Sequence, residues 1–335
     1  MDVFIVWTKY QSRVESLVNE YKDKNKKIKI IYRENPSTSS KIKKIKMYIS
    51  YFLKDIQDLN KYKPSNIFIQ LPPTASLLAP YIYKIFNKNT KIIGDGHNSL
   101  FRKPWINRIG TKILINKLDV LIVHNKTVYE NIKLTFNEKL KIVVLEDNSI
   151  ELNKDAELRL KNIASNDGSH IVFFPASFNL DEPIIEFIDA IKVNKNIKFY
   201  MTGNKEKLSR NFGINHKELP DNLILTGWLS NSEYEQLLID CDILVGLTIY
   251  DDIQMSVSNE GLSYSKAMVL SKKHTLIDIY KNAAIFTENT STSISKSINE
   301  ALQMKKELIE NSRMVLEEKN KRFEEQFSSL DRKIN

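Results

Sequence analysis

Residues 241–271, CDILVGLTIYDDIQMSVSNEGLSYSKAMVLS, contain two short apolar runs separated by a polar loop and a helical stretch. The runs Ile243–Leu247 and Met268–Leu270 have the length and composition of buried strands, and a helix is predicted near 259–266. A strand, a helix and a second strand in this order are typical of parallel strands joined by a crossover helix. The stretch therefore predicts an α/β protein.

The same alternation of apolar runs and amphipathic stretches continues along the whole chain and predicts two doubly wound, Rossmann-like domains. Strands are expected in the first half at Val3–Trp7, Lys29–Tyr32, Asn66–Gln70, Lys91–Ile93, Val120–His124 and Ile142–Leu145. Strands are expected in the second half at Ile171–Phe174, Lys198–Met201, Leu223–Leu225, Ile243–Leu247, Met268–Leu270 and Ala284–Phe286. Helices are predicted near 10–21, 40–60, 74–87, 105–117, 125–134, 181–192, 231–239, 259–266 and 292–325.

The polar segment Asn148–Ser169 shows no strand pattern, and we interpret it as the linker between the domains. The predicted organisation is an N-terminal domain at 1–150, a C-terminal domain at 151–320 and a helix end or tail at 321–335. Ligands of doubly wound sheets bind just outside the carboxyl ends of the strands. Polar residues that directly follow a strand are therefore the first candidates for a functional site.

Glycine and cysteine usage excludes several classes of protein. The chain has 335 residues with only 9 glycines, and the first of them is Gly94. The glycine-rich turn of a classical dinucleotide-binding domain is therefore missing after the first strand, and no P-loop motif is present. The single cysteine, Cys241, excludes an intramolecular disulfide framework and a cysteine-cluster metal site, and it favours a reducing compartment.

Charge is distributed unequally between the two halves. Residues 1–150 carry 27 Lys and Arg against 13 Asp and Glu, a net charge of +14, whereas the remainder has 23 against 28, a net of −5. This asymmetry indicates that the first half faces something anionic, such as nucleic acid, an anionic bilayer or a phosphorylated substrate. No apolar run reaches the length of a membrane span and the N-terminus lacks the pattern of a signal peptide, so we expect a cytoplasmic protein.

The first candidate site follows the predicted strand Lys91–Ile93. The sequence GDGHN at 94–98 supplies Asp95, His97 and Asn98 on an expected turn, where glycine permits close backbone approach to a ligand. An isolated loop histidine that satisfies nearby carbonyl groups is the alternative. A His–Asp pair also suits a metal or a hydrolase, but no matched second cluster is apparent, so no metal is expected.

The second candidate site follows the predicted strand Ile243–Leu247. Asp251 and Asp252 lie in a loop there, and Glu260 lies at the start of the next helix. A carboxylate in this position can accept both hydroxyls of a ribose or a sugar, while the amides of Met255–Ser258 could hold phosphates. The alternative is that Glu260 only offsets the helix dipole, which is worth about 0.3–1 kcal/mol.

The third candidate comprises two loops, FPASFNLDEP at 174–183 and LTGWLSNSEY at 225–234. Ser177 follows one predicted strand, and Gly227 and Trp228 follow another. Each loop leads into a helix, with Asn231 or Ser232 as a candidate N-cap. A loop tryptophan is more often a lid over the core than a platform for base stacking.

These segments together resemble the GT-B glycosyltransferases, specifically the retaining, family-4-like group. NEGLSYSKAMVLS resembles the acidic segment of that group, usually written EALxxGKPxxxS, so that Asp252 and Glu260 fall on its two acidic positions. FYMTGN (199–204), LPDNLILTGWLSNSEYEQLL (219–238) and CDILVGLT (241–248) resemble its donor-domain series. DGHN and LDVLIVHN (118–125) resemble its histidine-bearing loop and the strand that closes its acceptor domain.

The resemblance implies two Rossmann-like domains facing each other across a cleft, with a nucleotide-diphospho-sugar as co-substrate. Glu260 would bind the donor ribose, Asp252 the sugar hydroxyls, and His97 would reach the sugar. Asp95 and Asn98 would lie on the acceptor side. The expected donor-binding residues are Ser177, Gly203, Lys205, Gly227, Trp228, Leu229, Gln254, Met255, Ser256 and Ser258.

The chain also departs from the family pattern. Asp181 and Glu182 stand where the family commonly has cationic residues that neutralise the diphosphate, and Lys205, Lys207 or Arg210 could replace that charge. Asp replaces Glu at 252, and Ser265 and Ala267 replace the usual glycine and proline. These departures bear on the donor and on the catalytic rate more than on the fold.

The basic segment 39–59, SSKIKKIKMYISYFLKDIQDL, predicts a helix with an apolar stripe and a lysine cluster at its start. The stripe, expected to face the core, comprises Ile42, Ile45, Ile49, Phe52, Ile56 and Leu59. Lysines at a helix N-terminus oppose the helix dipole, which favours an external anion such as a bilayer surface. A solvated polar face is the alternative. The lysines are Lys41, Lys43, Lys44 and Lys46.

The leading hypothesis is a retaining glycosyltransferase that acts on a lipid-linked or polysaccharide-precursor acceptor, with peripheral contact to the inner face of the membrane. The alternatives are a donor-binding partner subunit with weak catalysis and a GT-B nucleotide-sugar epimerase or hydrolase. Nucleic acid is not an expected partner, because no helix-turn-helix, zinc-finger or RNP-type signature is present. The sequence does not specify the sugar, base, linkage or oligomeric state.

Overall fold

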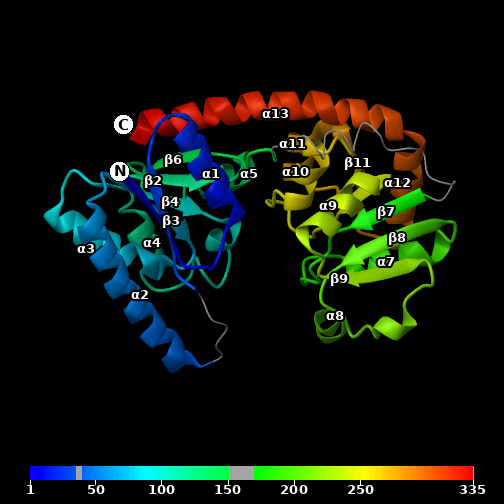
Figure 1. Cartoon of the computed structure of the whole chain (residues 1–335), viewed down its shortest axis with the longest axis horizontal. Coiled ribbons are helices and arrows are strands. Elements are labelled where there is room, and N and C mark those ends of the chain that lie inside the picture. Colours follow the sequence, from blue (N-terminus) through cyan, green and yellow to red (C-terminus); the bar gives the residue numbers. More distant parts are fainter. Residues whose placement is uncertain (35–39, 151, 153–169, 335) are drawn as a thin grey trace. The chain divides into compact units, whose positions relative to one another are not determined.

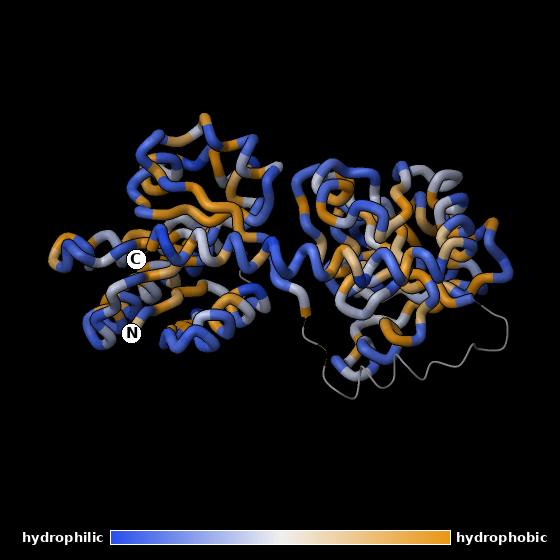
Figure 2. Tube along the Cα trace, turned by 90° about the horizontal axis from the view of Figure 1, so that it is seen from above, coloured by the Kyte–Doolittle hydropathy of each residue, from blue (hydrophilic) through white to orange (hydrophobic). Residues whose placement is uncertain are grey.

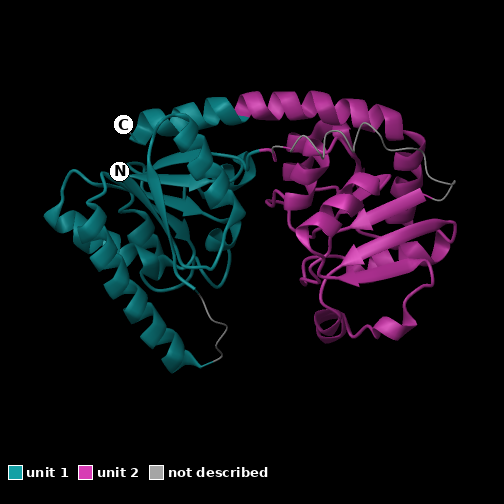
Figure 3. Cartoon of the chain, in the orientation of Figure 1, with its two compact units in different colours: residues 1–148, 323–335 teal, residues 149–322 magenta. Residues whose placement is uncertain are grey.

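The computed structural model describes residues 1–34, 40–150, 152 and 170–334. The chain forms two compact units, one made of Met1–Asn148 with Phe323–Asn335 and the other of Ser149–Arg322 (Figure 3). We refer to them as unit 1 and unit 2. Most of the expected linker, residues 151 and 153–169, lies outside the described residues.

Unit 1 is built on a six-stranded parallel sheet in the order β2-β1-β3-β4-β5-β6 (Figure 1). Its strands are β1 (Asp2–Val6), β2 (Ile28–Tyr32), β3 (Asn66–Leu71), β4 (Lys91–Gly96), β5 (Val120–Val123) and β6 (Lys141–Val144). Its helices are α1 (Ser12–Asp23), α2 (Lys41–Tyr62), η1 (Thr74–Leu77), α3 (Leu78–Phe86), η2 (Asn98–Phe101), α4 (Thr111–Ile115) and α5 (Lys126–Ile132).

Both faces of this sheet are covered, as the continuous apolar strands require. In β1, Val3 and Ile5 belong to a buried cluster that also contains side chains of α2, α3, α4 and α5. Phe4 and Val6 point to the opposite face, where they pack in a cluster with α1 and the C-terminal end of the chain. The strand alternation thus divides the core of unit 1 into two layers.

Unit 2 has a second six-stranded parallel sheet, in the order β12-β11-β10-β7-β8-β9. Its strands are β7 (His170–Phe174), β8 (Ile197–Thr202), β9 (Leu223–Gly227), β10 (Ile243–Gly246), β11 (Ala267–Ser271) and β12 (Ala284–Thr287). Its helices are α7 (Ile184–Val193), α8 (Lys205–Phe212), η3 (His216–Glu218), α9 (Asn231–Asp240), α10 (Ser256–Ser263), α11 (His274–Tyr280), η4 (Lys281–Ala283), α12 (Ser291–Gln303) and most of α13 (Lys305–Ile334).

The predicted fold class is confirmed, and each of the twelve expected strands is present to within a few residues. Hydrophobic residues concentrate on these strands, whereas the helices mix both kinds of residue (Figure 2). Two helix predictions are wrong. The helix expected at 105–117 covers only Thr111–Ile115, because Gly110 directly before it has a left-handed backbone (φ +83°). The helix expected at 292–325 is divided into α12 and α13.

The turn expected at Gly94–Gly96 is also wrong, because these residues continue β4. A Cβ atom at Gly94 would come within 2.7 Å of Leu118 Cδ1, and one at Gly96 within 2.9 Å of Phe101 Cζ. These glycines therefore allow close packing of the strand against its neighbours, and not a turn around a ligand.

The prediction that the apolar stripe of α2 faces the core is wrong for the first half of the helix. Ile42, Ile45 and Ile49 are 68%, 60% and 55% exposed, whereas the buried residues of α2 are Tyr51, Asp55 and Leu59. With 22 residues the helix is about 33 Å long, while the strands below it, of four to six residues, span about 13–20 Å. The helix is too long for the sheet to bury all of it.

The last helix, α13, has 30 residues and contributes to the cores of both units. The segment 321–335 is expected as a helix end or tail, and its described residues, 321–334, form the end of α13 and complete the core of unit 1 with Phe323, Phe327 and Leu330. Among the residues that the structure describes, no helix combines the length and the hydropathy that a membrane span needs.

Candidate active site

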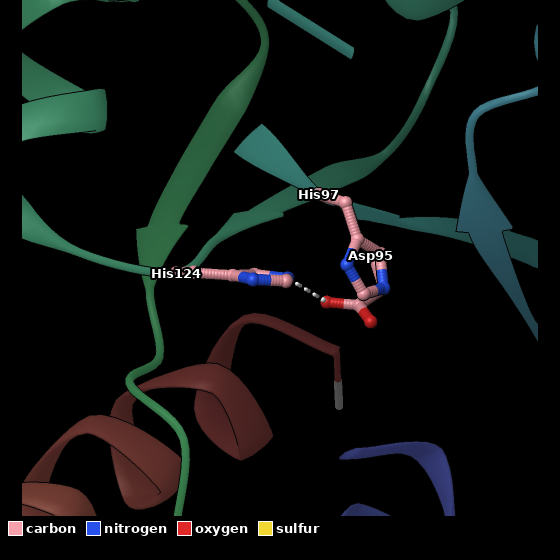
Figure 4. A group of neighbouring side chains, drawn as sticks. All are labelled: Asp95, His97 and His124. Atoms are coloured by element: carbon pink, nitrogen blue, oxygen red, sulfur yellow. Dashed lines mark hydrogen bonds and ion pairs between the residues drawn. The ribbon is translucent and has the colours of Figure 1, made fainter. Parts of the chain in front are cut away.

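In unit 1, polar side chains meet where β3, β4 and β5 end. Gln70 lies near the end of β3, Asp95 and His97 lie in and directly after β4, and His124 directly follows β5. Figure 4 shows His124 directed at the Asp95 carboxylate, with the His97 ring beside it. The two imidazole rings lie 4.5 Å apart between centroids. The carboxyl ends of three parallel strands thus bring these side chains together.

Asp95 is fully buried and carries a negative charge. Its Oδ1 accepts hydrogen bonds from His124 Nε2 at 3.2 Å and from Arg13 Nε at 3.4 Å. Arg13 also forms an ion pair with Asp147 and donates from Nη2 to the carbonyl of Leu145 at 2.7 Å. Burial would raise the pKa of Asp95, but Arg13 and His124 outweigh burial and hold it well below its usual range.

His97 is neutral at pH 7. Burial and the neighbouring His124 lower its pKa to about 4, against the opposing effect of Asp95. The amide nitrogens of Gln70 and Gln11 lie 2.9 Å and 3.1 Å from its Nε2, so that this nitrogen accepts and the ring proton lies on Nδ1. Within the described part of the chain, the buried acceptors Gln70 Oε1 and Asp95 Oδ2 have no hydrogen-bond partner.

Asp95, His97 and His124 offer ligand atoms within 4.8 Å of one another and could hold a metal ion. Two imidazoles and a carboxylate are a donor set that suits Zn²⁺. The guanidinium of Arg13, however, already supplies the positive charge that compensates the buried carboxylate. Two unpartnered buried acceptors beside a neutral imidazole suit an incoming hydroxyl group equally well, because a hydroxyl both donates and accepts.

Sequence reasoning identified Asp95 and His97 but missed the four residues that contact them, Gln11, Arg13, Gln70 and His124. Asn98, also predicted, begins η2. His124 and Gln70 sit at strand ends, so a stricter search of those positions would have found them. Arg13 and Gln11 come from the start of α1 and are more than 80 residues from Asp95 and His97 in sequence. No local pattern marks that pairing.

In unit 2, the loop after β7 folds around the carboxylate of Glu182. The backbone amide of Ser177 donates to both carboxylate oxygens at 3.1 Å, and the amide of Asn179 donates at 3.3 Å. Phe178 between them has a left-handed backbone (φ +54°). Burial raises the pKa of Glu182 to about 7, against the amide hydrogen bonds that favour its charged form.

The same loop is tied to its neighbours. Lys207 Nζ donates to the carbonyl of Ser177 at 2.7 Å and to Asn179 Oδ1 at 2.6 Å. Thr248, two residues beyond β10, donates from its hydroxyl to Asp181 at 3.1 Å. Lys207, in the first turn of α8, therefore holds this loop through its ammonium group, and Lys205 is exposed at the start of α8.

Glu260 lies on α10, which follows β10. The hydroxyl of Tyr234, from α9, donates to Glu260 Oε2, and burial raises the pKa of Glu260 while this hydrogen bond opposes the shift. Gln254 and Tyr280 both donate to Asn259 Oδ1 at 2.9 Å, which fixes the chain around the start of the helix.

The first turn of α10 starts without a side-chain cap. Its N-cap residue is Met255, which makes no side-chain capping bond, and Ser256 after it is exposed. Ser258 is buried and donates from its hydroxyl to the carbonyl of Met255 at 3.1 Å. A helix N-terminus without a side-chain cap leaves backbone amides available for an anion.

The remaining predicted residues lie in the loops along the same edge of the sheet. Asp251 accepts from the amide of His274 at 2.6 Å and so caps α11, whereas Asp252 lies partly buried in the loop before α10. Gly203 directly follows β8 and Gly227 ends β9, and the Gly203 amide donates to the Gly227 carbonyl at 3.2 Å. Trp228 is 69% exposed, so it is not a lid over the core, and Leu229 beside it is partly buried.

The four lysines predicted to face an anion are all exposed along the first turns of α2. Ser40 caps this helix through a hydrogen bond from the amide of Lys43, and its first turn contains no acidic residue. Lys41, Lys43, Lys44 and Lys46 are therefore open to solvent. The exposed isoleucines of α2 lie among them.

Comparisons with known proteins rest on structure alone. No family model matches the chain, and no curated protein matches it. Sucrose-phosphate synthase from Thermosynechococcus elongatus superimposes with a TM-score of 0.77 at 11% identity, covering 100% of this chain and 99% of that one. An α,α-trehalose-phosphate synthase from Burkholderia xenovorans gives 0.73 at 9% identity, covering 100% of both chains. Anabaena HepE in complex with UDP and glucose gives 0.69 at 12% identity, covering 98% and 99%. The chain therefore has the GT-B fold.

Proposed function

We propose that this protein is a glycosyltransferase that moves a sugar from a nucleotide-diphospho-sugar to an acceptor hydroxyl. The observation that carries the proposal is the position of Glu260, a partly buried carboxylate held by Tyr234 one turn beyond the N-terminus of α10. The GT-B fold and the binding of UDP and glucose by the structural neighbour HepE support it.

The donor is proposed to bind at the carboxyl end of the unit 2 sheet. Glu260 would accept the ribose hydroxyls, and the amides at Met255–Val257 would face the diphosphate. The Ser258 amide already donates to the Met255 carbonyl at 3.2 Å. Glu182 already occupies the amides of Ser177 and Asn179, so these amides would not contact the diphosphate while its carboxylate remains there. Asp252 and Gln254 would border the sugar.

The transfer is proposed to proceed with retention of configuration and without a protein nucleophile. The bond between the anomeric carbon and the diphosphate oxygen breaks, the acceptor oxygen bonds to the same face, and the acceptor proton passes to the departing phosphate. Positioning and stabilisation of the leaving diphosphate then supply the catalysis. Neutral His97, with Asp95 Oδ2 and Gln70 Oε1, would bind a sugar hydroxyl.

The acceptor is proposed to be a lipid-linked or polysaccharide-precursor glycan. The basic first half of the chain supports this, because its 27 Lys and Arg against 13 Asp and Glu, a net +14, favour a phosphorylated or membrane-borne partner. Asp95 and Asn98 at the end of β4 are the residues proposed to lie nearest that acceptor.

The test is a titration with UDP-, GDP-, ADP- and dTDP-sugars, followed by thermal unfolding and by assay of sugar release or transfer. At least one donor should raise the melting temperature of the wild type, and Glu260→Ala should abolish that shift. Glu206→Ala is the matched control, because Glu206 is an exposed first-turn acid of α8 and so reproduces the helix-dipole role alone.

The possible outcomes of this test distinguish between different functions. If a donor stabilises the protein but no sugar is released or transferred, the protein is a donor-binding partner subunit and not a transferase. If an epimerised donor is recovered, the protein is an epimerase. If no nucleotide sugar stabilises the protein, or if Glu206→Ala acts like Glu260→Ala, the donor site proposed at α10 is wrong.

A further inference from the structure

The N-terminal half of α2 exposes an apolar stripe. Ile42, Ile45, Ile49 and Leu53 are 68%, 60%, 55% and 54% exposed. Their spacing of three or four residues places them on one side of the helix, separate from the buried side formed by Tyr51, Asp55 and Leu59. Single exposed apolar residues are ordinary, but a stripe of four large ones marks an interaction surface.

The neighbouring helix α3 exposes a second stripe. Leu78, Ile82, Ile85 and Phe86 are 45%, 42%, 65% and 82% exposed, again at helical spacing, while Ala79, Pro80 and Tyr83 on the other side are buried. Helices α2 and α3 pack against each other on the same face of the unit 1 sheet. We call these two stripes together the α2–α3 face.

The charged residues in the first half of α2 all have one sign. Residues 40–54 contain five lysines and no acidic residue, and Lys41, Lys43, Lys44 and Lys46 are exposed. The first acid in the helix, Asp55, is buried and accepts hydrogen bonds from Trp7 and Arg33. The surface of this half of α2 is therefore apolar and cationic, and residues 40–54 themselves contain no acid.

We propose that the α2–α3 face binds the interface of an anionic bilayer. The isoleucines of α2 and the apolar side chains of α3 would enter the boundary between headgroups and acyl chains, and the lysines would remain at the level of the lipid phosphates. A second copy of the chain is a poorer occupant, because a two-fold interface would place the same lysine cluster against itself. The proposal goes beyond the donor site and does not depend on it.

The experiment is flotation of the full chain with vesicles of phosphatidylcholine, with and without phosphatidylglycerol. Wild type should float with the anionic vesicles. The triple variant Ile42→Ser, Ile45→Ser, Ile49→Ser should bind them at least about tenfold more weakly, because each side chain loses a favourable transfer from water. Substituting Lys41, Lys43, Lys44 and Lys46 by Ser should also weaken binding and remove most of its salt dependence.

Matched controls come from unit 2. Ile185→Ser, Val193→Ser and Ile277→Ser remove three exposed apolar side chains, and Ser at Lys195, Lys198, Lys217 and Lys296 removes four exposed lysines. Both controls should bind vesicles like wild type. In addition, Ile45→Trp should show a blue shift of tryptophan emission on anionic vesicles, whereas Ile185→Trp should not.

If the isoleucine variant binds vesicles as well as wild type, the α2–α3 face does not insert into the bilayer. If wild type binds neither kind of vesicle, the proposal of a membrane partner is wrong. If wild type binds no vesicles but self-associates, and the isoleucine variant does not self-associate, the α2–α3 face binds a second copy of the chain and not a membrane. Donor stabilisation in the isoleucine variant should equal that of wild type, which separates this inference from the donor site.

Discussion

At the scale of single residues, His97 joins the chemistry of unit 1 to its stability. Burial is the main cause that lowers the pKa of His97 from its ordinary value of 6.5 to about 4. Between these two pH values, the imidazole is therefore protonated in the unfolded chain but neutral in the folded chain. The free energy of unfolding should therefore fall as the pH drops from 6.5 to about 4, by up to about 3 kcal/mol from this group. His97→Gln should flatten that part of the profile.

The profile is measured by urea unfolding at a series of pH values, with His216→Gln as the control at an exposed histidine of η3. The difference between each variant and wild type isolates one side chain, because all other titrating groups are shared. If His97→Gln keeps the wild-type slope between pH 4 and 6.5, the description of His97 as a partly buried neutral imidazole is wrong.

At the scale of elements, the turn after β8 is constrained by the loop after β7. Gly203 has a φ of +115°, and a Cβ atom there would lie 2.5 Å from Phe178 Cε2 and 3.1 Å from the carbonyl of Ala176. Gly213, at the end of α8, has a φ of +69° and open space around it. Gly203→Ala should cost about 3 kcal/mol or more from clash and strain, and Gly213→Ala about 1 kcal/mol from strain alone.

Chemical denaturation of the two variants gives the comparison directly. The larger loss at Gly203 should come from the loop after β7, because the displaced Phe178 lies between the amides that hold Glu182. Equal losses at the two glycines would show that Phe178 relaxes without cost and that the loop is not constrained by this turn.

The elements also show what the sequence could predict. All twelve strands were predictable because each is a short apolar run, which has few alternatives in a parallel sheet with both faces buried. The exposed half of α2 was not, because a helical stripe has the same spacing whether it covers a core or an external surface. Asp95 and His97 followed from strand ends, whereas Arg13 joins the site only through the packing of α1.

At the scale of the whole molecule, helix α13 belongs to both cores. Val315 packs in the cluster of unit 2 with Leu244 and Tyr280, and Phe327 packs in the cluster of unit 1 against Tyr21 at 4.7 Å between ring centroids. The division of the chain therefore does not follow its order, since the last residues complete the first unit. Periodicity predicted a helix here but not its partners, because an amphipathic pattern does not identify the core that it meets.

This arrangement predicts that two substitutions on one helix destabilise different units. Phe327→Ala should cost about 3–5 kcal/mol and Val315→Ala about 2 kcal/mol, because the two side chains are 1% and 3% exposed in well-packed clusters. Hydrogen exchange followed by mass spectrometry should then show faster exchange of β1 and β2 in Phe327→Ala, and of β10 and β11 in Val315→Ala. Glu324→Ala, at an exposed position of the same helix, should change neither. Should both core variants accelerate exchange equally in both sheets, α13 would couple the two units into one cooperative structure, and the loss of either contact would be felt throughout the chain.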